Sequence, residues 1–279
     1  MIKIAHISDL HFSKVSFFPI ALKRFVGVTN LLINRRKSYI EDHLYKLPTL
    51  LKSLDIDHIF ITGDLTSTSL EKEFEKAKDF IDLFDKKNKF FIIPGNHDTY
   101  TKKAYKDELF YQFFKKTNIS KMIKSNIQIH ELSDKWVYIG LDTTVPTSLF
   151  SCSGLFSKEL ENSLIETLDK IPKDTNIILT NHFPLFLRVE KRNGLNRRKH
   201  LLAILKKYKN IKLYLYGHTH KWTITKKENY PYMICSGCSS HKKKASFNTL
   251  QIEDNKCIVT SYSLKNNNWQ KDSDKILSF

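Results

Sequence analysis

Histidines and acids recur directly after short apolar runs, and their spacing suggests metal chemistry. The segment LYLYGHTHKW places His218 and His220 one residue apart, behind a glycine and an apolar run. The N-terminal segment HISDLHF places Asp9 and His11 at the same spacing. In extended backbone, side chains at i and i+2 point to the same side, so each pair could face one site.

Three further segments end an apolar run with the same kind of polar group. They contribute Asp64 in ITGDLTS, Asn96, His97 and Asp98 in IPGNHDT, and His182 in LTNHFPL. In layered α/β folds, ligands gather at the carboxyl ends of strands, so residues this far apart could meet in one cleft. A glycine directly precedes Asp64, Asn96 and His218, where a tight turn or a close backbone approach would require one.

The runs that carry these groups alternate with helical patterns. The strand-like runs are IKIAHIS, DHIFITG, KFFIIPG, WVYIGLD, NIILTNH and IKLYLYG, and the helical patterns span residues 69–87, 157–170 and 198–208. This alternation predicts an α/β layered fold. After residue 231 the runs YPYMICS, SFNTLQIE and CIVTSYSL predict an antiparallel sheet portion.

We expect one domain over residues 1–264, with a basic and apolar insertion at 15–45 and a loosely held polar tail at 265–279. The chain has 279 residues, of which 41% are hydrophobic and 27% charged, as in soluble globular proteins. It has no run near the ~20 apolar residues that cross a bilayer. Nor does the N-terminus resemble a secretory signal.

The four cysteines are too few for a disulfide framework in a chain this long, which favours a reducing, cytoplasmic location. Cys235 and Cys238 form a CxxC without a second ligand pair, so we interpret them as structural residues at a strand end. The formal net charge of +17 predicts an anionic partner: a phosphate substrate, nucleic acid or an acidic membrane surface.

A mixed set of imidazoles and carboxylates suits divalent Mn, Fe, Zn, Ni or Co better than Ca²⁺, which prefers oxygen alone. Because a carboxylate has two oxygens, Asp64 could bridge two ions ~3.5–4 Å apart. Two carboxylates and a bridging hydroxide would leave a two-ion site with about one net positive charge, which suits a phosphate anion.

The ordered set D-x-H, G-D, G-N-H-D, N-H and G-H-x-H resembles the calcineurin-like metallophosphoesterase superfamily over roughly residues 2–223. The resemblance implies a four-layer α/β/β/α sandwich. It also implies two metal ions, one held by Asp9, His11, Asp64 and His220, the other by Asp64, Asn96, His182 and His218. His97 would act as general acid or phosphate stabiliser, and Asp98 would orient or tune it.

The expected reaction is hydrolysis of a phosphodiester or pyrophosphate bond by metal-activated hydroxide. His97 would protonate the leaving oxygen, a step typically worth ~10²–10⁴-fold. Neither a Ser-His-Asp arrangement nor a phosphate-binding GxxxxGK[ST] loop competes with this assignment.

Three segments mix basic and apolar residues and should rim the site: 15–45, 145–157 and 183–200. Such a rim favours a lipid-linked substrate at the membrane surface, placing the protein peripheral to the inner membrane. The superfamily resembled here includes pyrophosphatases of lipid A biosynthesis. The alternative is that the apolar residues pack on the core and the charges are merely solvated.

Other functions fit the same motifs. They also resemble the cyclic-nucleotide phosphodiesterase branch, and the DNA-repair nuclease branch shares the core, although basic charge alone provides only non-specific affinity for nucleic acid. A catalytically inactive binding scaffold is the alternative of another class. Against the scaffold, every expected ligand is present, and so is His97.

Overall fold

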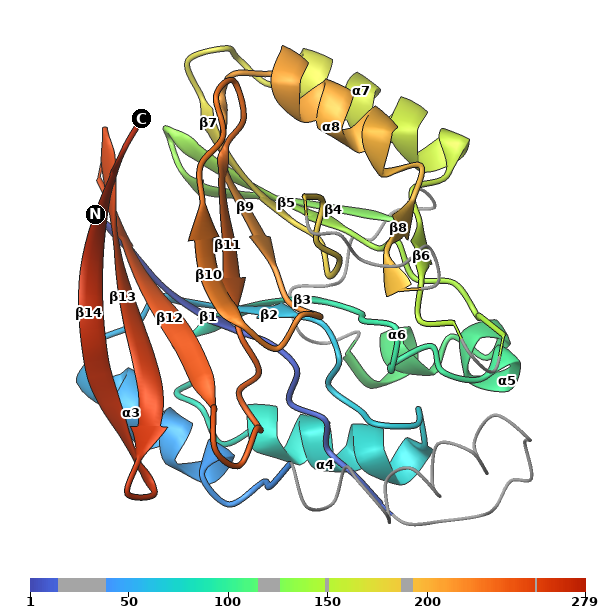
Figure 1. The fold of residues 1–279 in the computed structure, drawn as a ribbon, viewed down its shortest axis with the longest axis vertical. Coiled ribbons are helices and arrows are strands. Elements are labelled where there is room, and N and C mark those ends of the chain that lie inside the picture. Colours follow the sequence, from blue (N-terminus) through green and yellow to red (C-terminus); the bar gives the residue numbers. More distant parts are fainter. Residues whose placement is uncertain (15–38, 115–125, 149–150, 187–192, 254) are drawn as a thin grey trace.

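The computed structural model describes residues 1–14, 39–114, 126–148, 151–186, 193–253 and 255–279. Within these ranges the chain forms two six-stranded sheets that lie face to face (Figure 1). The first has the order β14-β13-β12-β1-β2-β3 and the second β10-β11-β9-β7-β5-β4. The predicted α/β fold is confirmed.

The strands of the first sheet are β1 (Ile2–Ile7), β2 (His58–Thr62), β3 (Lys89–Ile93), β12 (Ser246–Ile252), β13 (Lys256–Lys265) and β14 (Asn268–Ser278). Those of the second are β4 (Ile127–Ser133), β5 (Trp136–Leu141), β7 (Asn176–Thr180), β9 (Ile211–Tyr216), β10 (Trp222–Thr225) and β11 (Tyr232–Ser236). A small parallel pair joins β6 (Gly154–Leu155) to β8 (Leu195–Asn196).

Helices cover the outer face of each sheet, which completes the four layers (Figure 1). The first sheet carries a 3₁₀ turn, η2 (Leu44–Lys46), with α3 (Leu47–Ser53), α4 (Glu71–Ile81), α5 (Lys102–Lys106) and α6 (Leu109–Phe114) on its side, and the second carries α7 (Lys158–Lys170) and α8 (Arg198–Lys207). The three predicted helices correspond to α4, α7 and α8, although α4 ends six residues earlier than its pattern suggested.

Apolar side chains fill the three spaces between the four layers. Ile59 and Ile61 of β2 pack in the cluster against the helices, whereas Phe60 between them packs against the second sheet. Alternate residues of a strand face opposite sides of its sheet, so a strand buried on both faces is apolar throughout. The short uninterrupted runs in the sequence therefore come from central strands.

The C-terminal residues contradict the prediction of a loose tail at 265–279. They form β14, an antiparallel partner of β13 from the pair Lys265–Asn268 to the pair Lys256–Ser278. The turn residues Asn266 and Asn267 have φ values of 50° and 60°, which suits a two-residue hairpin turn. As an edge strand, β14 is held by backbone hydrogen bonds and needs few apolar side chains, so its sequence looks polar.

The antiparallel portion predicted after residue 231 is confirmed for β12 and β13. In contrast, β11 joins the second sheet, where it lies parallel to β9 and antiparallel to β10. The apolar character of β11 reports burial, which does not distinguish a parallel neighbour from an antiparallel one.

Glu73 of α4 ties together the loops that leave β1 and β2. Its carboxylate accepts hydrogen bonds from the backbone N–H groups of Thr68 (2.8 Å), Lys14 (3.2 Å) and Leu70 (3.2 Å). Burial raises the pKa of Glu73, and these hydrogen bonds oppose that rise. Both loops carry predicted ligands, so the hydrogen bonds of Glu73 help to fix the positions of those ligands.

We expect Glu73→Ala to lower the free energy of unfolding by about 3 kcal/mol, because it leaves buried backbone donors without an acceptor. Urea unfolding measures the change. The matched control is Glu71→Ala on the exposed side of the same helix, for which we expect a change within about 0.5 kcal/mol. Equal effects of the two substitutions would contradict the role assigned to Glu73.

Candidate metal centre

All nine predicted site residues lie at one edge of the two sheets, where the parallel strands end. Asp9 and His11 follow β1, and Asp64 follows β2. The other six are Asn96, His97 and Asp98 after β3, His182 after β7, and His218 and His220 after β9. The face-to-face packing of the sheets thus brings together residues separated by more than 200 positions in the chain.

The first group consists of Asp9, His11, Asp64 and His220, whose potential ligand atoms all lie within 4.8 Å of one another. His220 Nε2 lies 3.0 Å from Asp9 Oδ1 and 3.2 Å from His11 Nε2. The distance from His11 Nε2 to Asp64 Oδ2 is 4.0 Å. This set of two imidazoles and two carboxylates can hold one divalent ion.

The second group consists of Asp64, His182 and His218, again within 4.8 Å, together with the side-chain oxygen of Asn96. Asn96 Oδ1 lies 3.2 Å from His182 Nε2 and 2.9 Å from His218 Nδ1. Asp64 Oδ2 is 3.4 Å from His182 Nε2. One carboxylate oxygen of Asp64 therefore faces both groups.

The chemistry of the donors fits two cations. Imidazole nitrogens face each other at 3.2 Å between His11 and His220 and at 3.3 Å between His182 and His218. Two lone pairs at such distances repel each other unless a proton or a cation lies between them. Nitrogen and carboxylate oxygen together are the ligands that borderline divalent ions prefer.

Burial and charge act in opposite directions on the carboxyl groups of this centre. Burial raises the pKa of Asp9 and Asp64, but the neighbouring histidines, chiefly His220 and His182 respectively, outweigh it and lower both pKa values. For His182, burial lowers the pKa, yet the Asp64 carboxylate raises it to about 9. A metal ion held by His182 would compete with a proton for the same ring nitrogen.

Five of the candidate ligands have left-handed backbone conformations. The φ values are 57° for Asp9, 48° for His11, 56° for Asp64, 67° for His218 and 55° for His220. The prediction that extended backbone aligns each i, i+2 pair is therefore wrong, because both members of each pair sit in a left-handed turn. Such conformations cost about 1–3 kcal/mol each and concentrate at functional sites.

Glycines allow the loops to approach the ligands closely, as predicted. A Cβ on Gly95 would lie 2.2 Å from Asp64 Oδ1, and one on Gly217 would lie 2.0 Å from Ser8 Oγ and 2.6 Å from Asp9 Oδ2. Any larger residue at either position would push a candidate ligand out of place.

Backbone carbonyls orient the two histidines of the second group. His182 Nδ1 lies 2.7 Å from the carbonyl of Thr62, and His218 Nε2 lies 2.8 Å from that of Asn193. A nitrogen that faces a carbonyl must carry a proton, so the other ring nitrogen is the one that would present its lone pair to a bound ion. His218 consequently uses Nδ1, whereas His182 uses Nε2.

His97 lies beside the first group. Its Nδ1 donates to the carbonyl of Ser67 (2.7 Å), and its backbone N–H donates to Asp64 Oδ1 (2.8 Å). The imidazole lies edge-on to His11, with 5.0 Å between ring centroids, and stacks on Tyr100 at 5.4 Å. The contact with Ser67 therefore fixes the orientation of the His97 ring through Nδ1.

Asp98 was predicted to orient or tune His97, and its hydrogen bonds go to backbone groups and to Thr66. Its carboxylate accepts hydrogen bonds from the backbone N–H groups of Gly95 (2.9 Å), Thr66 (2.8 Å) and Leu65 (3.2 Å), and from Thr66 Oγ1 (3.0 Å). Asp98 thus joins the loop after β2 to the loop after β3, while the Ser67 carbonyl orients the His97 ring. Burial and the nearby Asp64 charge raise the pKa of Asp98 to about 7.

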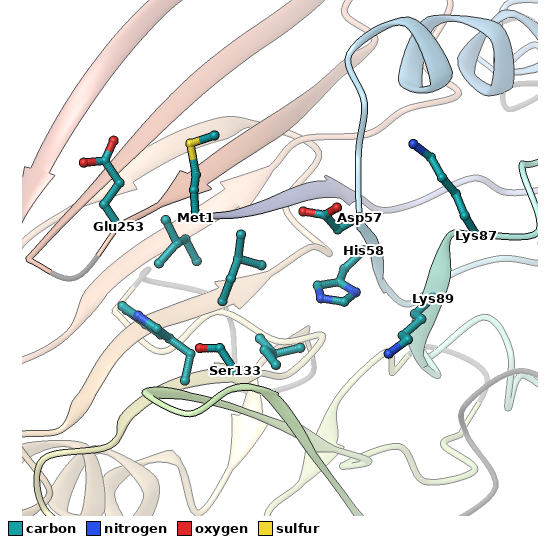
Figure 2. A pocket seen from close by; sticks show the side chains of 11 residues that line it. Met1, Asp57, His58, Lys87, Lys89, Ser133 and Glu253 are labelled. Carbon is teal, nitrogen blue, oxygen red and sulfur yellow. The ribbon is translucent and has the colours of Figure 1, made fainter.

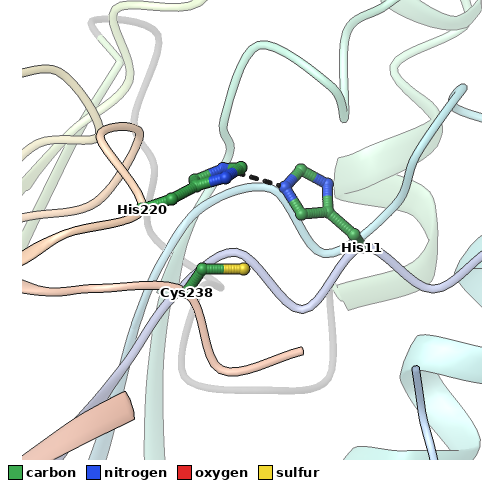
Figure 3. Close-up of side chains that lie close together, drawn as sticks. All are labelled: His11, His220 and Cys238. Atoms are coloured by element: carbon green, nitrogen blue, oxygen red, sulfur yellow. Dashed lines mark hydrogen bonds between the residues drawn. The ribbon is translucent and has the colours of Figure 1, made fainter. Parts of the chain in front are cut away.

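Cys238 lies beside the first group of candidate ligands, a position that its CxxC motif did not indicate. Its Sγ lies with the ring nitrogens of His11 and His220 inside a 4.8 Å cluster (Figure 3). Burial raises the pKa of the thiol, and Sγ donates to the carbonyl of Asp9 (3.2 Å). We therefore interpret Cys238 as a brace for the left-handed turn at Asp9. Only its place after β11, at the same edge of the sheets, hinted at this contact.

The segments predicted to rim the site are described only in part, since 15–38, 149–150 and 187–192 lie outside the described residues. Among the apolar residues that are described, Phe156, Phe183 and Leu185 are buried in the cluster beneath α7 and α8. These three residues pack on the core, whereas Leu155 of the same rim is exposed.

A separate cavity of about 480 Å³ opens at the opposite edge of the sheets (Figure 2). Its lining includes His58 and Lys89, the first residues of β2 and β3, and Trp136, the first residue of β5. None of the nine predicted site residues, all of them described, contributes to it. The cavity is therefore distinct from the metal centre.

Comparison with curated proteins finds phosphodiesterases. A probable glycerophosphodiester phosphodiesterase GpdQ of Arcobacter nitrofigilis is 26% identical over 61% of this chain and 58% of its own length. A probable cyclic nucleotide phosphodiesterase of Vesicomyosocius okutanii is 23% identical over 76% of this chain and 84% of its own length. The chain thus spans less than two thirds of the first of these relatives.

Solved structures share the fold. A dimetal phosphatase of Danio rerio superimposes with a TM-score of 0.69 at 10% identity, over 99% of this chain and 98% of the other. A purple acid phosphatase from yellow lupin seeds gives 0.67 at 12% identity, over 99% of this chain and 53% of the other. The profile of the calcineurin-like phosphoesterases matches residues 2–222. With two clusters of Asp and His that can each hold a divalent ion, the chain belongs to the calcineurin-like phosphoesterase family.

Proposed function

We propose that this protein hydrolyses a phosphodiester bond with two divalent metal ions. Asp9, His11, Asp64 and His220 would hold one ion, and Asp64, Asn96, His182 and His218 the other. The observation that carries the proposal is the position of Asp64 Oδ2, which lies 4.0 Å from His11 Nε2 in one group and 3.4 Å from His182 Nε2 in the other. When bound, such ions activate water and neutralise charge on phosphate oxygens.

The protein's own residues would position the substrate and move one proton. His97 Nδ1 donates to Ser67, so the proton given to the leaving oxygen would come from His97 Nε2. His97 must then carry protons on both nitrogens when the substrate binds. Asp98 would act as a positioning residue, because its hydrogen bonds hold the loop that carries His97.

The substrate class that we favour is a small phosphodiester, such as a cyclic nucleotide or a glycerophosphodiester. Support comes from the names of the relatives, which include glycerophosphodiester and cyclic nucleotide phosphodiesterases. A nuclease activity would instead require DNA binding that weakens steeply as salt rises.

The test is a hydrolysis panel with the chelated protein resupplied with Mn²⁺, Fe²⁺, Co²⁺, Ni²⁺ or Zn²⁺. The substrates are bis(p-nitrophenyl) phosphate, cyclic AMP, glycerophosphocholine, DNA and a UDP-linked lipid. We expect no turnover after chelation and recovery with at least one ion. Absence of turnover with every ion and substrate would favour the inactive scaffold.

A lipid-linked substrate at an anionic membrane is a second candidate. It is supported by the net charge of +17 and by Lys242, Lys243 and Lys244, which are exposed in a turn next to the metal centre. The ring of His241 organises this turn, since its Nδ1 accepts from the N–H groups of Lys243 and Lys244 at 3.1 Å each. No helix within the described ranges is long and apolar enough to cross a bilayer.

Co-sedimentation with vesicles of anionic and of zwitterionic phospholipid tests this second candidate. Binding only to the anionic vesicles at low salt, reduced when the three lysines are replaced by serine, would support it. Absence of binding to either kind of vesicle would remove the membrane part and leave the hydrolytic centre unaffected.

A further inference from the structure

Tyr39 lies against the first group of candidate ligands, although no sequence motif contains it. It forms an isolated antiparallel bridge with His241, and the adjacent Ile40 N–H donates to the carbonyl of Ser240 (3.0 Å). Ser240 in turn donates from Oγ to the carbonyl of Asp9 (2.9 Å). The backbone around Tyr39 is therefore tied to the same loop that braces Asp9.

The side chain of Tyr39 reaches the outer nitrogen of a candidate ligand. Its Oη lies 3.0 Å from His220 Nδ1, on the far side of the ring from the Nε2 that faces Asp9. The phenol ring packs at 4.9 Å from the ring of His11 and at 5.7 Å, nearly perpendicular, from that of His220. Tyr39 thus contacts both histidines of the first group.

His220 needs such a partner more than the other ligands do. Its side chain is 25% exposed, whereas the side chains of His11 and His182 are 1% exposed. Backbone carbonyls hold the outer nitrogens of His182 and His218 in place. For His220 the corresponding position is occupied by the Tyr39 hydroxyl.

We propose that Tyr39 positions His220 for metal binding by accepting the proton of its Nδ1, so that Nε2 presents a lone pair toward Asp9. This inference rests on the proposed function, since it concerns the same metal centre. A hydroxyl suits the role because it can accept from Nδ1–H when an ion is bound and donate to Nδ1 when Nε2 carries the proton. A phenylalanine would keep the packing and lose this contact.

The test compares Tyr39→Phe with the wild type by titrating chelated protein with Mn²⁺ in a calorimeter. We expect one of two binding steps to weaken by about 10–100-fold, the usual effect of removing a partner that orients a metal-ligating histidine. The visible spectrum of the Co²⁺-loaded variant should change as well, because a reoriented imidazole alters the ligand field. The thermal midpoint of the metal-free protein should stay within about 2 °C of the wild type, since the loss of one half-buried hydroxyl changes the free energy of unfolding little.

Tyr45→Phe is the matched control. The ring of Tyr45 packs on Phe12 and Phe80, and this variant should bind both ions as the wild type does. Unchanged binding and spectrum in Tyr39→Phe would overturn the inference. Equal weakening of both sites with a lower metal-free midpoint would also overturn it, because that pattern indicates a structural role. If the wild type itself binds no ion, the proposed function fails instead.

Discussion

Asp64→Asn is expected to reduce hydrolysis by at least about a thousandfold, since a metal centre contributes several kcal/mol to transition-state stabilisation. Asparagine preserves the size of the side chain and can still accept from the His97 N–H through Oδ1. It removes the negative charge of the oxygen that faces both groups of ligands. We therefore expect both ions to be lost or weakened together, whereas replacing a ligand of one group alone should affect mainly that ion.

Metal content after dialysis, measured by inductively coupled plasma mass spectrometry, checks this result alongside turnover. The matched control is Asp82→Asn, which removes an exposed carboxylate at the C-cap of α4 that pairs with Lys78 of that helix. It should keep two ions and wild-type activity. Two tightly bound ions in Asp64→Asn would contradict the shared role of Asp64.

His97→Ala is expected to lower kcat by about 10²–10⁴-fold for substrates with an alkyl leaving group, because such a group must be protonated as it departs. The loss should be much smaller with bis(p-nitrophenyl) phosphate, whose aryl group leaves readily as an anion. Metal content should not change, since His97 belongs to neither group of candidate ligands.

The dependence on the leaving group separates acid catalysis from simple phosphate binding. A residue that only stabilises the phosphate would cause equal losses with both substrates, and that result would argue against proton donation by His97. His200→Ala serves as the control, because His200 of α8 is an exposed histidine whose Nδ1 lies 3.0 Å from Glu161 of α7. Its kcat and metal content should match the wild type.

The type and order of the site residues were predictable from local sequence. Each candidate ligand follows a short apolar run, and such runs become buried strands wherever both faces of a sheet are covered. His182, for example, follows β7, and Asp64 follows β2. Because parallel strands deliver their carboxyl ends to one edge, the pattern of apolar run and polar end already implied convergence.

The backbone and the supporting contacts were not predictable. Left-handed conformations at Asp9 and His220 are imposed by the surrounding structure, since most residues of these types occupy other regions. The strand β14 reads as a polar tail because backbone pairing at a sheet edge leaves little trace in side-chain type.

The amino-acid sequence by itself determined the chemistry of this protein: which imidazoles and carboxylates are present, and which strand delivers each. Only the tertiary structure decided how they are held, with Tyr39 contacting His220, Glu73 accepting from the loops after β1 and β2, and Asp98 joining the loops after β2 and β3. The physical reason is the distance along the chain between the residues that interact. Burial and strand ends depend on neighbouring residues, whereas Asp98 joins the loops after two different strands of the first sheet. The contact of Tyr39 with His220, which follows β9 of the second sheet, forms only when the two sheets pack.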